Sequence, residues 1–418
     1  MGSVRGPAMS RWVPSFEVWL PQVRERLAEQ RYGKCATLHY PGAMRRFCRD
    51  LERRGESLTA VRTVDVVRYL GRLRRQQSKG PYPAHLKRFH RAAIHMLLRL
   101  VHGAWPPPFL PATPLERDVA ATVTAFDGWM RDLRGLAEAT RRHRRAEARW
   151  LLAWLDERGR PLCQVTAADL DAYLGERIAL QCRRSAAQSA ATLRAVLRYL
   201  HDSGRMPVDL STLVNGPTIY ALERLPSMIA PEHIHRVLAV LRRDHTPTGR
   251  RDYAIWMLLT TYGLRAGEVR ALTLADVDWR HERLHIRHAK TGGSSELPLL
   301  PGPARALLAY LRHGRPQTAD RTVFLRAQAP YVGLQNATSL HGIVTRGLAA
   351  AGIEVTGKRG PHALRHSRAV SLLRGGVSLK VIGDVLGHRS ERSTATYLRL
   401  ATDDLREVAL AVPRGAVP

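Results

Sequence analysis

Residues 361–397 have the sequence PHALRHSRAVSLLRGGVSLKVIGDVLGHRSERSTATY, in which proline and glycine residues mark where helices begin and end. Pro at its start and Gly375-Gly376 after an apolar periodic run predict a helix over 361–374. A second helix is predicted over 379–386, because Gly387 follows its last apolar residue. This part of the chain is therefore expected to be helical, with short turns between the helices.

Four side chains of this stretch suit chemistry on a phosphate. His362 and Arg365 are three residues apart in the first turn of a helix, so they share a face near an N-terminus that favours phosphate. His388 follows the second helix, and Tyr397 comes nine residues later, in what we expect to be another short helix. A phenol has a pKa near 10, so Tyr397 becomes a nucleophile only where cations stabilise the phenolate or a base takes its proton.

Upstream, further charged residues stand at the ends of predicted elements. An apolar helix is predicted over 252–264, and Arg265 follows it with Glu268 one turn later, so that the carboxylate can orient the guanidinium. An ordinary surface ion pair would have the same spacing. Residues 284–287 and 296–299 predict the strands of a β-hairpin whose turn contains Lys290.

Attack on a phosphodiester develops negative charge that metal ions or Arg and Lys must stabilise. The carboxylates of Asp276 and Asp278 form the one close acidic pair in this part of the chain, and His362 with His366 have the spacing of metal ligands. Trp279 leads from the acidic pair into the first predicted strand, and the His pair has no evident third ligand nearby, so we expect no metal.

The composition favours a polyanionic partner. Lys and Arg total 66 against 36 acidic residues in 418, which gives a net charge of +30, and basic groups that neutralise phosphates release condensed counterions. An Arg-rich proteome would also produce this bias. The chain has six Lys, so a Lys at a special position is an unusual choice. No apolar run would span a bilayer and no secretory signal is evident, so we expect a cytoplasmic protein.

Two segments that precede the helices described above resemble each other. Phe16-Glu17-Val18-Trp19-Leu20 matches Phe126-Asp127-Gly128-Trp129-Met130. A gapless alignment of 51–71 with 155–175 retains, among its identical residues, Leu51, Gly55, Leu58, Val61, Asp65, Tyr69, Leu70 and Gly71. We interpret this as an internal duplication of a helical bundle. The expected domains are residues 1–104 and 115–204, a linker over 205–226, and a third domain over 227–408. Trp19, Trp129, Tyr69 and Tyr173 are interpreted as core residues rather than base-stacking ones, and residues 141–145 as a phosphate-contacting or merely solvated basic face.

The order and spacing of the reactive residues resemble those of the tyrosine recombinase (phage integrase) superfamily. The matching residues are Gly263-Leu264-Arg265-Ala266-Gly267-Glu268, Lys290, His362-Ala363-Leu364-Arg365-His366, Leu386-Gly387-His388 and Tyr397. The resemblance implies a multidomain fold: two tandem all-α SAM-like (core-binding) bundles, then a mainly helical α+β catalytic domain with a small antiparallel sheet. The first bundle departs from the simplest family members, which carry one such domain.

The resemblance also implies a reaction. Arg265 and Arg365 would hold the scissile phosphate, as would His362 and His388, with His362 accepting the proton of Tyr397. Lys290 would protonate the departing 5′ oxygen, and Glu268 would orient Arg265. Tyr397 would end joined to a 3′ phosphate, and two strand exchanges through a Holliday junction would complete recombination, with no cofactor required. The implied partners are double-stranded DNA and a homotetramer on paired sites, with or without a companion recombinase, and the expected role is to serve a mobile element.

Two other functions use the same residues. A type IB topoisomerase shares the Arg, Lys, His and Tyr chemistry but relaxes supercoils as a monomer, and the Leu-Gly-His motif and the paired helical domains favour recombination over it. A DNA-binding regulator without catalysis would be expected to lack one of the six residues, and the sequence retains all six.

Overall fold

The computed structural model describes residues 16–77, 84–107, 111, 113–220, 227–288, 292–355, 357–388 and 394. The chain divides into two compact units, residues 109–225 and residues 1–108 with 226–418. Within the described residues, three large hydrophobic clusters form, over 16–105, 123–214 and 229–364.

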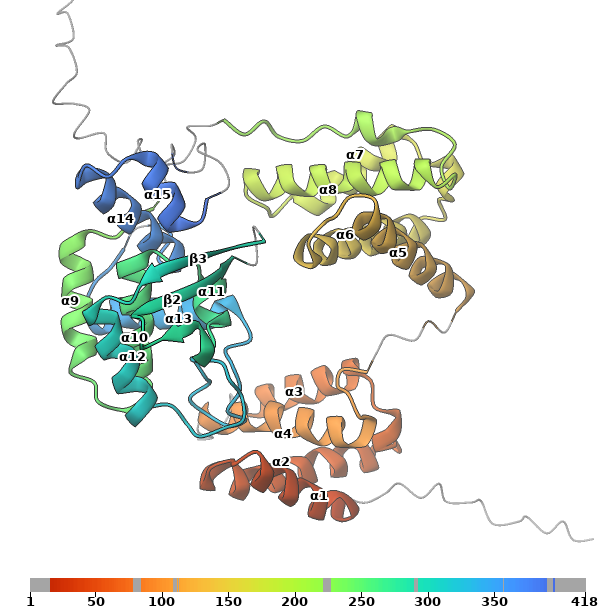
Figure 1. The fold of residues 1–418 in the computed structure, drawn as a ribbon. Coiled ribbons are helices and arrows are strands. Elements are labelled where there is room, and N and C mark those ends of the chain that lie inside the picture. The colour runs from red at the N-terminus through yellow and green to blue at the C-terminus, as the bar shows by residue number, and fades with distance from the viewer. Residues whose placement is uncertain are drawn as a thin grey trace, which may run out of the picture. The chain divides into compact units, whose positions relative to one another are not determined.

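The first cluster lies in a bundle of four α-helices (Figure 1). These helices are α1 (Phe16–Glu29), α2 (Lys34–Arg53), α3 (Thr63–Gln77) and α4 (Ala84–His102), with the 3₁₀ turn η1 (Leu58–Ala60) before α3. Phe47, Leu51 and Leu97 are fully buried in its core. Tyr69 is buried in this core and Trp19 packs against it, as predicted for core residues.

The unit of residues 109–225 repeats that order of elements. It contains α5 (Pro114–Asp132), α6 (Glu138–Glu157), η2 (Leu162–Gln164), α7 (Ala167–Ile178) and α8 (Arg183–Asp202), followed by η3 (Leu210–Leu213). Both second helices have 20 residues and are followed by a glycine of positive φ, Gly55 and Gly159. A capping box of Thr166 and Asp169 starts α7. The structure thus repeats where the sequence does.

Part of the stretch interpreted as a linker belongs to the second bundle. Met206, Leu210 and Val214 lie within 205–226, yet they are buried in the bundle core. Arg194 on α8 also donates to the Val214 carbonyl at 2.9 Å. The 3₁₀ turn η3 brings these apolar side chains into the core of the second bundle. Their irregular spacing in the sequence did not indicate this packing.

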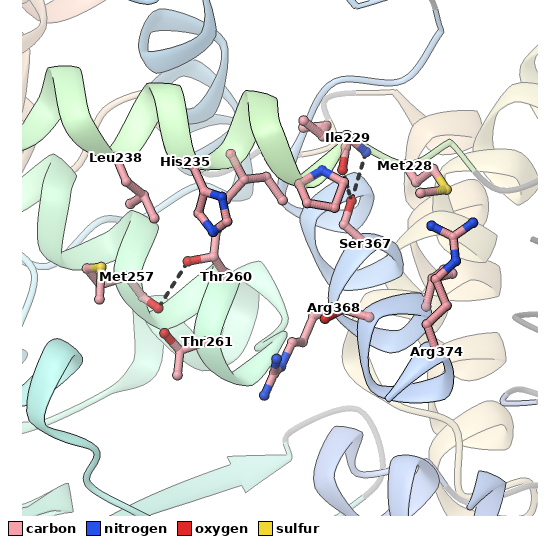
Figure 2. A pocket seen from close by; sticks show the side chains of 14 residues that line it. Met228, Ile229, His235, Leu238, Met257, Thr260, Thr261, Ser367, Arg368 and Arg374 are labelled. Atoms are coloured by element: carbon pink, nitrogen blue, oxygen red, sulfur yellow. Dashed lines mark hydrogen bonds between the residues drawn. The ribbon is translucent and has the colours of Figure 1, made fainter. Parts of the chain in front are cut away.

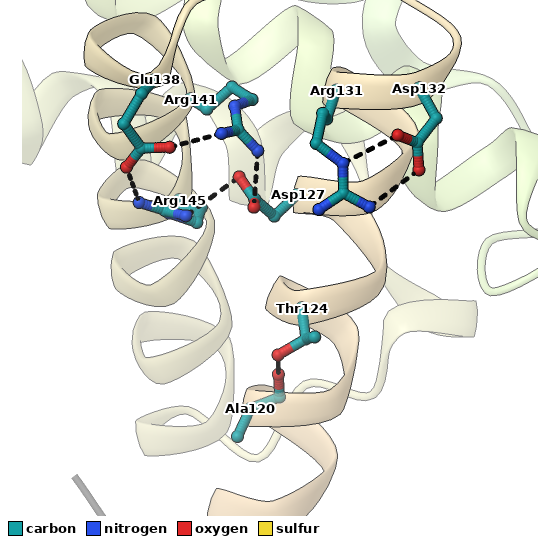
Figure 3. A network of polar contacts seen from close by, with 8 residues as sticks. All are labelled: Ala120, Thr124, Asp127, Arg131, Asp132, Glu138, Arg141 and Arg145. Atoms are coloured by element: carbon teal, nitrogen blue, oxygen red, sulfur yellow. Dashed lines mark hydrogen bonds and ion pairs between the residues drawn. The ribbon is translucent and has the colours of Figure 1, made fainter. Parts of the chain in front are cut away.

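The basic residues at the start of α6 are largely engaged in internal ion pairs. The guanidinium groups of Arg141 and Arg145 each contact both Asp127 of α5 and Glu138, over 2.6–3.0 Å (Figure 3). The Arg141 side chain is only 13% exposed. These two arginines therefore join α5 to α6, whereas Arg142 between them is exposed to solvent.

The third cluster is the core of a mainly helical domain with one three-stranded antiparallel sheet (Figure 1). Its helices are α9 (Pro231–Arg242), α10 (Pro247–Tyr262), α11 (Ala266–Ala271), α12 (Pro301–His313), α13 (Ala337–Ala350), α14 (Pro361–Arg374) and α15 (Leu379–Leu386), with the 3₁₀ turn η4 (Leu274–Asp276). The sheet order is β1 (Val277–Asp278), β2 (Arg283–His288) and β3 (Gly293–Pro298). The hairpin, α14 and α15 are present as predicted, and α10 begins five residues earlier than expected, where Thr246 caps it.

Candidate active site

The two predicted arginines meet at the carboxyl end of α15. Arg265 Nη2 donates to the Gly387 carbonyl at 3.0 Å, and Arg365 Nη2 donates to the Leu386 carbonyl at 2.6 Å. The last carbonyls of a helix have no partner within the helix, so guanidinium groups are suitable donors there. Arg365 Nη1 also donates to the Gly263 carbonyl at 2.9 Å. Three distant segments are thereby fixed around the Leu-Gly-His motif.

Glu268 orients Arg265 directly. Its Oε1 accepts from Arg265 Nη1 and its Oε2 accepts from the Arg265 backbone N–H, both at 2.7 Å, so the residues form the first turn of α11 as a capping box. Burial raises the pKa of the Glu268 carboxyl, but the hydrogen bonds from Arg265 and His288 together outweigh burial and hold that pKa below its usual range. The pair is 17% and 4% exposed, so it is not the ordinary surface ion pair that its spacing also allowed.

Two glycines permit this close approach. Gly387 ends α15 with φ +62° and Gly263 ends α10 with φ +66°, a backbone region that favours glycine. A Cβ on Gly263 would lie 2.8 Å from Leu386 Cδ2. A side chain at either position would therefore separate the segments that carry Arg265 and His388.

His388 is held by a residue that the sequence analysis did not single out. Its Nδ1 lies 2.8 Å from Oγ1 of Thr394, which is buried. If the threonine hydroxyl donates to Nδ1, Nε2 carries the ring proton and can donate to a phosphate oxygen. Burial, with the positive charges of Arg365 and Arg265, lowers the pKa of His388 to about 4, so the ring is neutral at pH 7.

His362 lies in the first turn of α14, and its ring stacks on that of His366 with centroids 6.0 Å apart. His362 also lines a cavity with His341, Lys358 and Arg359, so cationic groups surround the N-terminus of α14 as a phosphate site requires. Burial, together with the neighbouring His362 and Arg365, lowers the pKa of His366 to about 4.

Lys290 and Tyr397 lie outside the described residues, so their predicted positions are not compared with the structure. The strands that flank Lys290 pair as predicted, with His288 opposite Gly293 as the last pair before the turn. Thr394, three residues before Tyr397, is helical.

The carboxylates weighed as metal ligands have other partners. Asp276 Oδ2 accepts from the Thr273 N–H and hydroxyl and from Arg287 Nη2, over 2.6–2.7 Å. Asp278 accepts from the N–H groups of the following turn. Within the described ranges, no group of three or more His, Cys, Asp or Glu side chains has the arrangement of a metal site.

A separate pocket of about 380 Å³ lies between α9, α10 and α14 (Figure 2). His235, Met257, Thr260, Arg368 and Arg374 are among its lining residues, and none of the predicted catalytic residues is. Its wall near the start of α9 is fixed by Ser367, whose hydroxyl bonds the Ile229 backbone N–H and carbonyl at 2.8 and 2.7 Å (Figure 2). The candidate active site is therefore distinct from this pocket.

The chain is similar in sequence and fold to known recombinases. Residues 227–403 match the phage integrase family. A putative integrase/recombinase of Sinorhizobium fredii is 50% identical over 189 residues, which are 45% of this chain and 97% of the relative. The tyrosine recombinase XerD of Mycobacterium tuberculosis is 31% identical over 300 residues, which are 67% of this chain and 94% of the relative. The crystal structure of XerH recombinase bound to a palindromic difH substrate shares the fold, with a TM-score of 0.55 and 15% identity over 75% of this chain and 93% of that one.

The fold, the arginine and histidine cluster and these relatives define a site-specific DNA recombinase of the tyrosine class. The chain belongs to the phage integrase family. Within the described residues, no helix has the length and apolar composition needed to cross a bilayer.

Proposed function

We propose that Tyr397 attacks the scissile phosphate of a DNA strand, with Arg265, Arg365, His362 and His388 around that phosphate. The observation that supports this most directly is the pair of bonds from Arg265 and Arg365 to the adjacent Gly387 and Leu386 carbonyls. They converge from separate helices on the backbone just before His388. Preorganised cations of this kind stabilise negative charge that develops during reaction.

The reaction conserves the phosphodiester energy. The Tyr397 oxygen forms a bond to phosphorus, the bond from phosphorus to the 5′ oxygen breaks, His362 takes the phenol proton and Lys290 protonates the 5′ oxygen. A 5′ hydroxyl of a second strand then attacks the 3′ phosphotyrosine and releases Tyr397. No nucleotide cofactor and no metal enter these steps.

The two arginines differ in exposure. The Arg265 side chain is 17% exposed, whereas Arg365 is 3% exposed and donates to two backbone carbonyls. Arg365 thus secures the end of α15 against the end of α10, and Arg265 is the more accessible cation for a phosphate.

We further propose that the two helical bundles are tandem SAM-like core-binding domains, with the third domain catalytic. The matching order of α1–α4 and α5–α8 supports the duplication. The second bundle would clamp duplex DNA together with the catalytic domain, and the first would lengthen the footprint or contact a neighbouring protomer. Four protomers on two sites, joined in a Holliday junction, would exchange the ends of a mobile element.

Covalent trapping tests the nucleophile. The full chain would be incubated in EDTA with nicked suicide duplexes drawn from the DNA that flanks its own gene, and then with a genome-wide fragment pool. We expect a protein–DNA adduct that survives SDS and is absent with Tyr397→Phe. Binding of DNA without any adduct from the pool would overturn the catalytic proposal in favour of a DNA-binding regulator.

A further inference from the structure

His288, the last residue of β2, occupies a buried position between three elements that carry the candidate active site. It is 5% exposed. Its Nδ1 lies 2.7 Å from Glu268 Oε1 on α11, and its Nε2 lies 2.7 Å from Ser295 Oγ on β3. None of the reaction steps above uses this ring.

The contact with Glu268 reaches the phosphate-binding arginine. Glu268 Oε1 accepts from both His288 Nδ1 and Arg265 Nη1, each at 2.7 Å. Because an ionised carboxylate only accepts, Nδ1 donates to Glu268, and Nε2 forms the second hydrogen bond, to the Ser295 hydroxyl. One ring therefore connects the Arg265–Glu268 pair to the β2–β3 hairpin.

The ring also lies against the end of α15. A Cβ on Gly387 would be 2.5 Å from His288 Cε1 and Nε2, so a glycine is required there. The Gly387 carbonyl is the group to which Arg265 donates. His288 thus contacts the same short segment as Arg265, from the side of the sheet.

The hairpin turn starts at this anchored residue. His288 pairs with Gly293, and the Gly292 N–H donates to the His288 carbonyl at 2.8 Å. Lys290 lies between these two paired residues in the sequence.

We propose that His288 is a positioning residue for the cleavage step: it fixes the hairpin that carries Lys290 relative to Arg265, through Ser295 on one side and Glu268 on the other. This inference rests on the proposed role of Lys290 as the acid that protonates the 5′ oxygen. His288 itself transfers no proton to the DNA.

A sulfur substrate separates this role from simple support of the fold. When sulfur replaces the bridging 5′ oxygen, the leaving group is a thiolate, whose conjugate acid has a pKa of about 8.5 by analogy with Cys, so departure needs no acid. A defect that arises from a misplaced Lys290 is then relieved. A defect that arises from a misplaced Arg265 or from a loosened core is not.

The experiment measures adduct formation by the full chain on matched oxygen and sulfur suicide duplexes, at the site found by covalent trapping. We expect His288→Ala to slow adduct formation by about 10- to 100-fold on the oxygen substrate, the scale of a 1 Å misplacement, and to approach the wild-type rate on the sulfur substrate. Ser295→Ala, which removes the hairpin contact and leaves the Glu268 contact, should show the same pattern with a smaller loss. His285→Ala is the matched control, because His285 is on the same strand with a side chain 43% exposed, and it should match wild type on both substrates.

Lys290→Ala is measured in parallel. If the sulfur substrate does not restore Lys290→Ala, the acid role of Lys290 fails, and the inference fails with it. If the sulfur substrate restores adduct formation by Lys290→Ala, the acid role of Lys290 stands. The positioning role of His288 is then refuted by either of two results: His288→Ala and Ser295→Ala are equally slow on both substrates, or both variants form adduct at the wild-type rate on the oxygen substrate.

Discussion

Replacing Gly387 with Ala should disrupt the site by two separable effects. Gly387 has φ +62°, and an added Cβ would lie 2.5 Å from two atoms of the His288 ring. Gly376 provides a matched control in the same domain, since it has φ +76° and an added Cβ there has no neighbour within 4 Å. The control therefore reports the backbone strain alone.

The magnitudes follow from these two positions. A left-handed conformation costs an alanine about 1–2 kcal/mol, so Gly376→Ala should lose about that much stability and retain cleavage. Overpacking adds about 1–3 kcal/mol, which brings the expected loss for Gly387→Ala to about 2–5 kcal/mol. Because the Gly387 carbonyl accepts from Arg265, moving it should also slow adduct formation by about 100-fold.

Hydrogen exchange at the amides of α10 and α14, followed by mass spectrometry, would report opening of the catalytic core separately from the helical bundles. Adduct formation on the suicide duplex would report activity. If Gly387→Ala matched Gly376→Ala in both exchange and adduct formation, the close approach of Gly387 to His288 could not be what constrains this position, and the reasoning would be refuted.

Three further outcomes are expected. Thr394→Val should slow adduct formation by about 10-fold, because it removes the hydroxyl that bonds Nδ1 of His388. Tyr173→Phe should destabilise the second bundle by about 1–3 kcal/mol in urea denaturation, because its hydroxyl donates at 2.7 Å to the buried carboxyl of Glu147. Stability of the catalytic domain, measured by hydrogen exchange, should fall as pH decreases from about 6.5 to 4, because burial lowers the pKa of His366 to about 4 and the unfolded chain then binds more protons than the folded one.

Each of these outcomes has its own control. Thr394→Ser retains a hydroxyl and should keep most of the activity; equal loss in both variants would exclude the hydrogen bond as the cause. Tyr69→Phe should cost less than Tyr173→Phe, since the first bundle has Ala43 in place of the buried Glu147. His366→Asn should flatten the pH dependence, and an unchanged slope would assign it to other groups.

The sequence by itself determined the local elements of this protein. Pro361 begins α14 and Gly375 ends it, and Gly387 ends α15. Proline and glycine start or stop a helix through their own backbone preferences. The strands around Lys290 followed from local composition, and the pairing of Arg265 with Glu268 followed from helical spacing. The spacing of the family motifs also indicated the enzyme class, and the family match and the relatives confirm that class.

Only the tertiary structure decided which of these residues meet. The bonds from Arg265 to Gly387 and from Arg365 to Gly263 span more than 100 residues, and no local preference encodes them. Because side chains alternate along a strand, the sequence places His288 on the same face of β2 as the apolar Leu284 and Ile286. Its partners on α11 and β3 came only from the structure. The sequence determines which side chains each helix and strand carries. Packing of the shared core decides which polar groups are buried together, and these groups bond to one another because they have lost their contact with water.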